Sequence, residues 1–194
     1  MTITLRRHLQ DHGPLPPDRA LALFRTLAGT CAANGGRSVG RRLRPEGIML
    51  DAAGNPSLGD RSVTSPFDDR YLPGELHRGE APDVRADLFA LGVILFEALT
   101  GRHPDLWELP GEARPGVPPR ADELYRRCTS PSDRRFRSWE EALEFLDGGG
   151  GGAAAAAADA GPASPPAPSA RWRILAVAAA GALAGFALGR WAGG

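Results

Sequence analysis

Few residues of this sequence have the types and spacing that catalysis or metal binding requires. A basic loop holds Arg41, Arg42 and Arg44, and a single carboxylate, Asp60, follows a predicted strand. An arginine cannot accept a proton in a protein, although its guanidinium can attract an anion. Magnesium usually relies on one or two carboxylates together with substrate phosphates, so Asp60 alone is a poor metal site. These residues predict no catalytic centre and no bound metal.

The histidines and cysteines do not change this expectation. None of the four histidines shows ligand spacing to another histidine or to a cysteine: His8, His12, His77 and His103. We therefore expect no zinc site and no cofactor. Cys31 and Cys128 could pair, but no secretory segment follows the first methionine. A disulfide is therefore not expected, and the bulk of the chain is expected to be cytosolic and reduced.

Charge and composition exclude further classes of function. The 194 residues carry 23 cationic and 23 acidic side chains, so the net charge is zero. Without a basic field, nucleic acid is not an expected partner. Every cationic residue is arginine, and the sequence contains no lysine. A mechanism that needs a deprotonatable amine or a P-loop lysine is therefore excluded.

Composition divides the chain into three parts. Residues 1–147 carry almost all of the charge and most of the large apolar side chains, so we expect one folded domain there. Residues 148–170 contain almost only glycine, alanine, serine and proline. Such a stretch cannot bury enough apolar surface to offset its chain entropy, which predicts a disordered linker. Residues 171–194 form the third part.

This third part predicts a single membrane-spanning helix. Residues 174–191 are apolar apart from Arg190, which could snorkel to the interface. Trp172 and Trp191 flank the segment at the positions of an interfacial aromatic belt, and two arginines on its N-terminal side favour a cytoplasmic location for the domain. We therefore expect a single-pass protein of the cytoplasmic membrane. The alternative is a soluble, alanine-rich helix.

Small residues recur on one face of this tail. Gly181, Gly185 and Gly189 are spaced every four residues, which makes a shallow groove that a second helix can approach closely. This spacing predicts homodimerisation through the tail helix, although glycine and alanine are abundant throughout the segment.

The folded part is predicted to be mainly helical with a small β-hairpin. Helices are predicted from Pro16 to Asn34, over residues 85–100 with Gly101 just past the end, and from Ser138 through Leu146. Ser138 opens the last helix with the spacing of a capping box. Short strands are predicted over residues 47–50 and 56–58, joined by a tight turn.

Five short segments of the domain carry motifs in a particular order. They are VGRRLRPEGIML at 39–50, SLGDRS at 57–62, YLPGE at 71–75, DLFALGVILFE followed by TGRHP within 87–104, and PSDRRF at 131–136. Together they resemble the C-terminal lobe of a bacterial, eukaryotic-like Ser/Thr protein kinase. The patterns they resemble are HRDLKPENILL, the approach to DFG, YxAPE, DxxxLGxxLxE…TGxxP, and the PxxR before the last helix. The resemblance implies a kinase-like C-lobe fold for residues 1–147.

The resemblance also shows where this sequence departs from the family. Arg42 and Gly47 match the Asp that accepts the substrate proton and the Asn that holds a second magnesium ion. Neither residue can perform those roles, because an arginine is not a base and a glycine has no side-chain oxygen. Arg44 matches the loop lysine, and Asp60 and Met49 match the metal-binding and adenine positions as vestiges. The alternative for Asp60 is an exposed carboxylate in a turn.

Four further positions match residues that are architectural in the family. Glu75 and a C-terminal arginine are implied to form a buried ion pair, and Arg135 is our choice, although Arg134 competes for the role. Asp87 is implied to hold the backbone of the catalytic loop. Arg41 matches the arginine that pairs with a phosphorylated activation segment. The alternative for Arg41 is a solvated basic loop.

We therefore expect a pseudokinase. The resemblance places residues 1–5 at the exit from the hinge, so the nucleotide-covering N-terminal lobe is absent from this sequence. Apolar surface where that lobe would dock is expected to bind a protein partner, such as a kinase or a membrane protein. One alternative keeps nucleotide binding, with an N-terminal lobe supplied in trans or missed upstream. Another is a structural protein that clusters in membranes through the glycine-faced tail.

Overall fold

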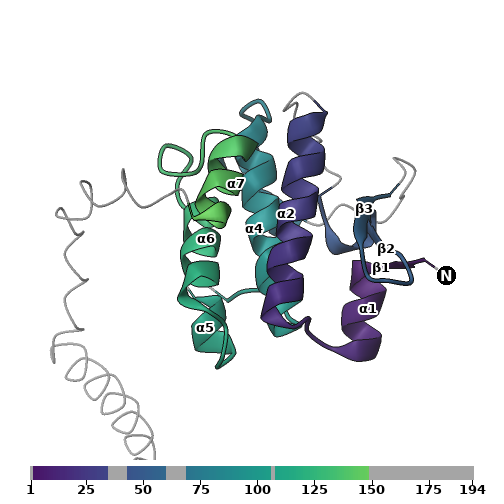
Figure 1. The fold of residues 1–194 in the computed structure, drawn as a ribbon. Helices are drawn as coiled ribbons and strands as arrows, with labels where there is room; N and C mark the ends of the chain where they lie inside the picture. Colours follow the sequence, from purple (N-terminus) through teal and green to yellow (C-terminus); the bar gives the residue numbers. More distant parts are fainter. Residues whose placement is uncertain (1, 35–42, 60–68, 106–107, 149–194) are drawn as a thin grey trace, which may run out of the picture. The chain divides into compact units, whose positions relative to one another are not determined.

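The computed structural model describes residues 2–34, 43–59, 69–105 and 108–148 (Figure 1). The chain divides into two units, Met1–Gly152 and Ala153–Gly194, and all of the described residues lie in the first. The predicted linker beyond Gly148 and the predicted membrane helix lie outside the described residues. Both stay predictions.

A small antiparallel sheet forms one part of the domain. Its strands are β1 (Ile3–Thr4), β2 (Ile48–Leu50) and β3 (Pro56–Leu58), in the order β1-β2-β3. In the turn between β2 and β3, the carboxylate of Asp51 accepts hydrogen bonds from the backbone N–H groups of Ala53 and Asn55 at 2.8 Å each. The predicted hairpin is confirmed. The pairing of β1 with β2 adds a third strand that was not predicted.

The long helix α4 (Val84–Thr100) is the centre of the core. From Ala86 to Leu99 every side chain except Phe89 is buried, so the helix is covered on nearly all sides. The side chain of Asp83 accepts hydrogen bonds from the first free N–H groups, and Gly101 ends the helix in the left-handed conformation, with φ at 79°. The predicted helix and its glycine stop are confirmed.

Two other predicted helices are also present. Helix α2 (Pro17–Ala33) begins with proline at its first position and ends at Asn34, and α7 (Trp139–Asp147) begins at Ser138, whose hydroxyl accepts the N–H of Glu141. The capping box is only half formed, because the Glu141 carboxylate bonds the N–H of Arg137 rather than that of Ser138. Helix α2 packs against α4, α7 and β3.

Several elements were not predicted. Helix α1 (Leu5–His12) is capped by the Thr4 hydroxyl and buries Leu5 and Leu9. Helix α6 (Pro119–Thr129) buries four side chains at helical spacing: Ala121, Leu124, Tyr125 and Cys128. Among the described residues, the remaining short helices are α3 (Gly74–His77), α5 (Pro110–Ala113), and the 3-10 turns η2 (Pro45–Gly47) and η3 (Asp69–Tyr71).

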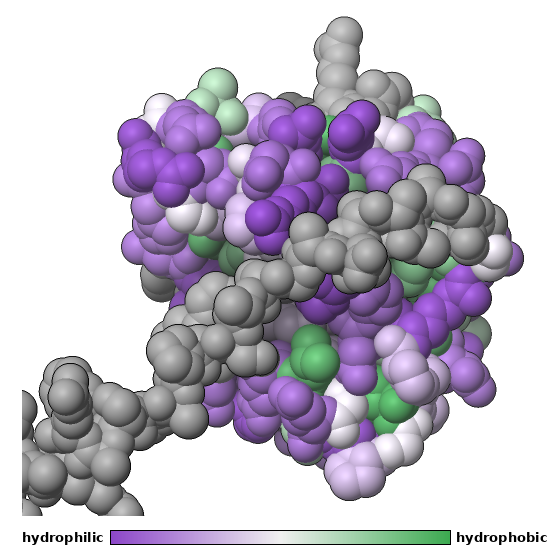
Figure 2. All heavy atoms as spheres, turned by 90° about the vertical axis from the view of Figure 1, so that its left-hand side faces the viewer, coloured by the Kyte–Doolittle hydropathy of each residue, from purple (hydrophilic) through white to green (hydrophobic). Residues whose placement is uncertain are grey.

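The elements form a helical bundle with the small sheet at its side. Helices α2, α4, α6 and α7 lie together, and α1 and the three strands gather on the far side of α2 (Figure 1). The face formed by α5, α6 and α7 is mostly hydrophilic where the structure describes it, with separate apolar spots (Figure 2). The mainly helical fold class with a small β element is confirmed for the described residues.

Candidate functional site

The turn that leads into β2 uses Gly47 for its backbone. The Gly47 N–H donates to the Arg44 carbonyl at 2.9 Å, and the Gly47 carbonyl accepts the N–H of Gly59 at 2.8 Å. A Cβ on Gly59 would lie 3.2 Å from the Gly47 oxygen and 3.3 Å from Met49 Cγ, so η2 and the end of β3 approach each other closely. Gly47 is buried and offers no side-chain atom to a metal or nucleotide.

Met49 lies on the outward face of the small sheet. Its neighbours in β2, Ile48 and Leu50, are buried, whereas Met49 is half-buried and pairs with Thr4 on one side and Ser57 on the other. Directly paired residues share a face of the sheet. In the described strands this face therefore presents one thioether between two hydroxyls.

A charged network that the sequence did not predict joins α1, η2, η3 and α4. Arg6 Nε donates to Glu46 Oε1 at 2.7 Å, and Arg6 Nη2 donates to the Tyr71 hydroxyl at 2.7 Å. The Tyr71 hydroxyl donates to Glu97 Oε1 at 2.8 Å. Arg6 Nη2 also lies 3.1 Å from Glu97 Oε2, an ion pair whose angles fall short of a hydrogen bond.

The environment of this network favours a charged arginine and a neutral tyrosine. Burial acts to lower the pKa of Arg6, but the hydrogen bond to Glu46 and the charge of Glu97 together raise that pKa above its usual value. Burial and the charge of Glu97 raise the pKa of Tyr71. Tyr71 therefore stays a hydrogen-bond donor to Glu97, and the network is a structural element of the domain.

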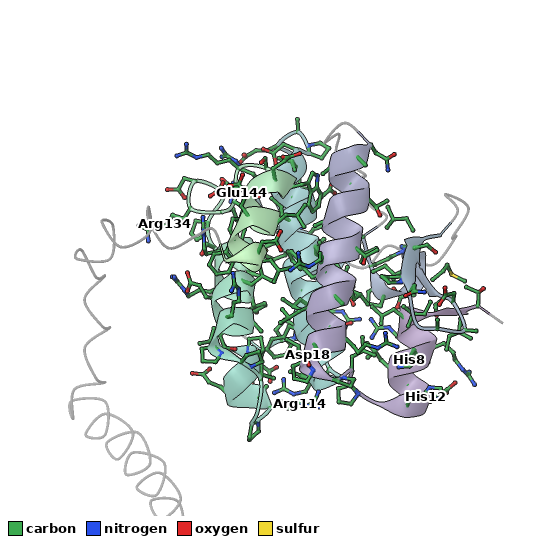
Figure 3. All side chains as sticks on the ribbon, in the orientation of Figure 1. His8, His12, Asp18, Arg114, Arg134 and Glu144 are labelled. Atoms are coloured by element: carbon green, nitrogen blue, oxygen red, sulfur yellow. The ribbon has the colours of Figure 1, made fainter. Side chains whose placement is uncertain are left out.

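Glu75 in α3 and Arg135, between α6 and α7, are 60 residues apart in the sequence and form an ion pair. Arg135 Nη1 and Nη2 both donate to the Glu75 carboxylate, the second at 3.2 Å, and Arg135 Nη1 also donates to the Arg85 carbonyl at 3.1 Å. The Arg135 side chain is only 3% exposed. Its neighbour Arg134 is exposed, and its side chain points away from the helices (Figure 3). The structure thus places Arg135, and not Arg134, beside Glu75.

Asp87 lies near the start of α4 and is 3% exposed. Burial raises the pKa of the Cys31 thiol on α2, and the negative charge of Asp87 adds a smaller effect, so that this pKa is about 12. Burial also raises the pKa of the Cys128 thiol. Both cysteines are therefore protonated, unreactive core residues at neutral pH.

The chain is similar to several bacterial protein kinases. It is 32% identical to the Ser/Thr protein kinase PknL of Mycobacterium tuberculosis, over an alignment of 162 residues that covers 68% of this chain and 41% of PknL. It is 29% identical to PknD of the same organism, over 74% of this chain and 26% of PknD. The chain is a homologue of bacterial Ser/Thr protein kinases. No family model matches it.

The fold of this kinase homologue agrees with that relationship. The crystal structure of the Mycobacterium tuberculosis PknI kinase domain superposes with a TM-score of 0.63 at 23% identity, covering 76% of this chain and 62% of that domain. This likeness shows the fold. PrkC of Bacillus subtilis is 30% identical over 53% of this chain but only 18% of PrkC. The chain thus spans less than half the length of these curated kinases.

Part of the predicted site lies outside the described residues. Arg41, Arg42 and Asp60 belong to this part, as do the three tail glycines. Arg44, Gly47 and Met49 lie around the start of β2, as described above, whereas Glu75, Asp87 and Arg135 lie within the helical part.

The network around Glu97 had a signal in the sequence. Glu97 is the one acidic residue within the otherwise apolar run from Leu88 to Leu99. A buried carboxylate needs a paired cation or several donors, so its position predicts partners without naming them. Arg6 could not be identified because α1 was not predicted.

No described helix is long and apolar enough to cross a membrane. Among the described residues, no three histidine, cysteine or acidic side chains gather as a metal site.

Proposed function

We propose that this kinase homologue is catalytically inactive and acts as a protein-interaction module held at the cytoplasmic membrane. The observation that carries the proposal is the identity of two positions. Arg42 stands where the family has its catalytic base, and Gly47 stands where it has the asparagine that binds magnesium. Phosphoryl transfer depends on positioning and electrostatic stabilisation by such groups.

The local geometry of Gly47 supports this proposal. Its carbonyl is used by the N–H of Gly59, and the adjacent carboxylate, Glu46, is paired with Arg6. The nearest acidic side chain in the sequence is therefore engaged and does not replace the missing asparagine. A second magnesium ion would lose a ligand at this position.

The rest of the domain supports a role that depends on the folded structure and does not require phosphoryl transfer. The buried ion pair of Glu75 with Arg135 and the network around Glu97 are intact, although the residues at the reactive positions differ from the family. A folded domain without catalytic residues can still present a surface that binds another protein. The proposed partner is a protein, such as a kinase or a membrane protein, and residues 174–191 would raise the local concentration of the module near it.

The test of inactivity uses the full chain in detergent micelles with magnesium and γ-labelled ATP. We expect no label on the chain or on a general acceptor protein, with PknL as the positive control. Label above that of a heat-denatured sample would contradict the proposal. An upward shift of the unfolding temperature with magnesium-ATP, without phosphoryl transfer, would favour the alternative of retained nucleotide binding. Magnesium-ATP at one hundred times its dissociation constant would stabilise the folded domain by about 2.7 kcal/mol.

The tests of anchoring and interaction compare the full chain with a chain ending at Gly148. We expect the full chain to resist carbonate extraction from membranes and the shorter chain to be released. For interaction, the full chain in nanodiscs is titrated against PknL as the kinase probe. Saturable binding to PknL would support a kinase partner. Binding to PknL that is no tighter than binding to an unrelated membrane protein would contradict the proposal of a kinase partner.

A further inference from the structure

Two histidines lie one above the other on α1. His8 and His12 are four residues apart, and their ring centroids lie 4.8 Å apart with planes inclined by 19°. Residues at this spacing share one face of a helix. Figure 3 labels both rings on α1, at the side of the domain. The sequence indicated no ligand spacing among the histidines because α1 was not predicted; on a helix, a separation of four residues is such a spacing.

The hydrogen bonding of the pair leaves nitrogen lone pairs available. His12 Nδ1 lies 3.3 Å from the His8 carbonyl oxygen, which can only accept, so Nδ1 carries the proton and Nε2 has a free lone pair. Metal-binding histidines usually donate their second ring N–H to a carboxylate or carbonyl in this way. No described residue makes a hydrogen bond to the His8 ring.

We propose that His8 and His12 form a binding site for a divalent transition-metal ion that favours imidazole, such as Zn²⁺ or Ni²⁺. Metal–nitrogen bonds of about 2.0–2.1 Å place two rings on one ion with centroids about 4.5–5.2 Å apart, for bond angles of roughly 90–109°. The observed separation of 4.8 Å lies within that range. The two rings are stacked and nearly parallel, and imidazole lone pairs lie in the ring planes, so binding requires one of the rings to turn out of the stack to another rotamer until both lone pairs meet at the ion.

The surroundings favour a neutral His8 ring and a site of two ligands. Burial and the charge of His12 lower the pKa of His8, against the opposing charge of Asp11. A metal requires the unprotonated ring. Asp11 is nearby, but its carboxylate is held by Arg7 Nε at 2.6 Å. The ion would thus bridge two turns of α1 through two imidazoles and keep its remaining positions for water.

The test uses the full chain in micelles, without a polyhistidine tag, titrated with zinc or nickel chloride in a calorimeter. We expect one ion per chain and a thermal shift of about 3–6 °C at ten times the dissociation constant. His12→Gln is exposed and should fold normally, and it should weaken binding at least tenfold; His8→Gln should do the same. His77→Gln, on the exposed end of α3, is the control and should bind like the parent.

Two results would overturn the proposal. One is the absence of binding even at millimolar ion. The other is unchanged binding in both His8→Gln and His12→Gln, which would assign the ion to other groups. Circular dichroism of each variant separates a lost site from lost folding, and His12→Gln decides the question if His8→Gln does not fold.

Discussion

Glu97 is the most deeply buried charge among the described residues, at 1% exposure, and its partners come from two other elements. Tyr71 donates to one carboxylate oxygen, and Arg6 lies beside the other. A charge in this position is tolerated only while its partners remain, because an unpaired buried carboxylate is strongly destabilising. The adjacent Arg7 offers a natural comparison, since it forms an exposed pair with Asp11.

We predict that Arg6→Met and Arg7→Met differ sharply in effect. Arg6→Met leaves Glu97 and Glu46 without their cation and should lower the free energy of unfolding by about 2–4 kcal/mol. Arg7→Met removes an exposed i,i+4 pair and should cost less than about 0.5 kcal/mol. Urea denaturation measures both. Equal losses would show that the network around Glu97 contributes no more than a surface pair.

Glu75 predicts how stability depends on pH. Burial acts to raise the pKa of Glu75, but the hydrogen bonds and charge of Arg135 hold that pKa below its ordinary value of 4.5. A lowered folded pKa means that the contribution is fully present above about pH 4.5 and is lost as the pH falls through the folded pKa. Glu75→Gln should therefore lower stability at pH 7 and flatten its decline between about pH 5 and 3.

Urea midpoints measured across this pH range for the parent and Glu75→Gln test this prediction. Glu144→Gln is the control, because Glu144 is exposed and makes no ion pair among the described residues (Figure 3). Parallel curves for the parent and Glu75→Gln would contradict the assignment, since other carboxylates would then account for the whole acid sensitivity.

At the scale of elements, the crossing of α4 and α6 is tightly constrained. A Cβ on Gly92 would lie 2.6 Å from Cys128 Cβ, well inside contact distance. Glycine at this position is required by packing, since it lets the two helices approach. In α2, by contrast, a Cβ on Gly29 would meet nothing within 4 Å.

We predict that the same substitution has opposite effects at these two glycines. Gly92→Ala should destabilise by about 1–3 kcal/mol, because α4 and α6 must move apart or distort. Gly29→Ala should stabilise by about 0.5–1 kcal/mol, because alanine loses less backbone entropy in a helix. Thermal unfolding of the two variants tests both signs. A neutral Gly92→Ala would mean that the crossing relaxes without cost.

At the scale of the whole molecule, the described residues contain one continuous core. It runs from Leu5 in α1 through α4 to Leu146 in α7. A domain of about 150 residues buries roughly 68–70% of its unfolded surface, which is enough for cooperative folding.

We predict that residues 1–148 fold without the rest of the chain. Their unfolding should be a single cooperative transition with a midpoint within about 2 °C of that of the full chain, since the composition of residues 148–170 predicts a disordered linker that adds no core. Circular dichroism and calorimetry measure this. A broad, non-cooperative transition would show that the lobe needs a partner or a further segment.

Local signals in the sequence were sufficient for part of this fold. Proline at the start of α2, Ser138 before α7 and Gly101 after α4 act on their own termini, so their meaning does not depend on distant residues. The hairpin followed from its turn for the same reason. The order of the motifs was also in the sequence, and it predicted the kinase relationship.

Tertiary structure alone decided how distant groups meet. The choice of Arg135 over Arg134 depends on which side chain is buried beside Glu75, 60 residues away. The pairing of Arg6 with Glu97 and the stacking of His8 on His12 depend on α1, which is short and whose cap and two buried leucines give a weak local signal. Such contacts follow from packing of the whole domain, because the energy that forms a short helix comes mainly from its buried face.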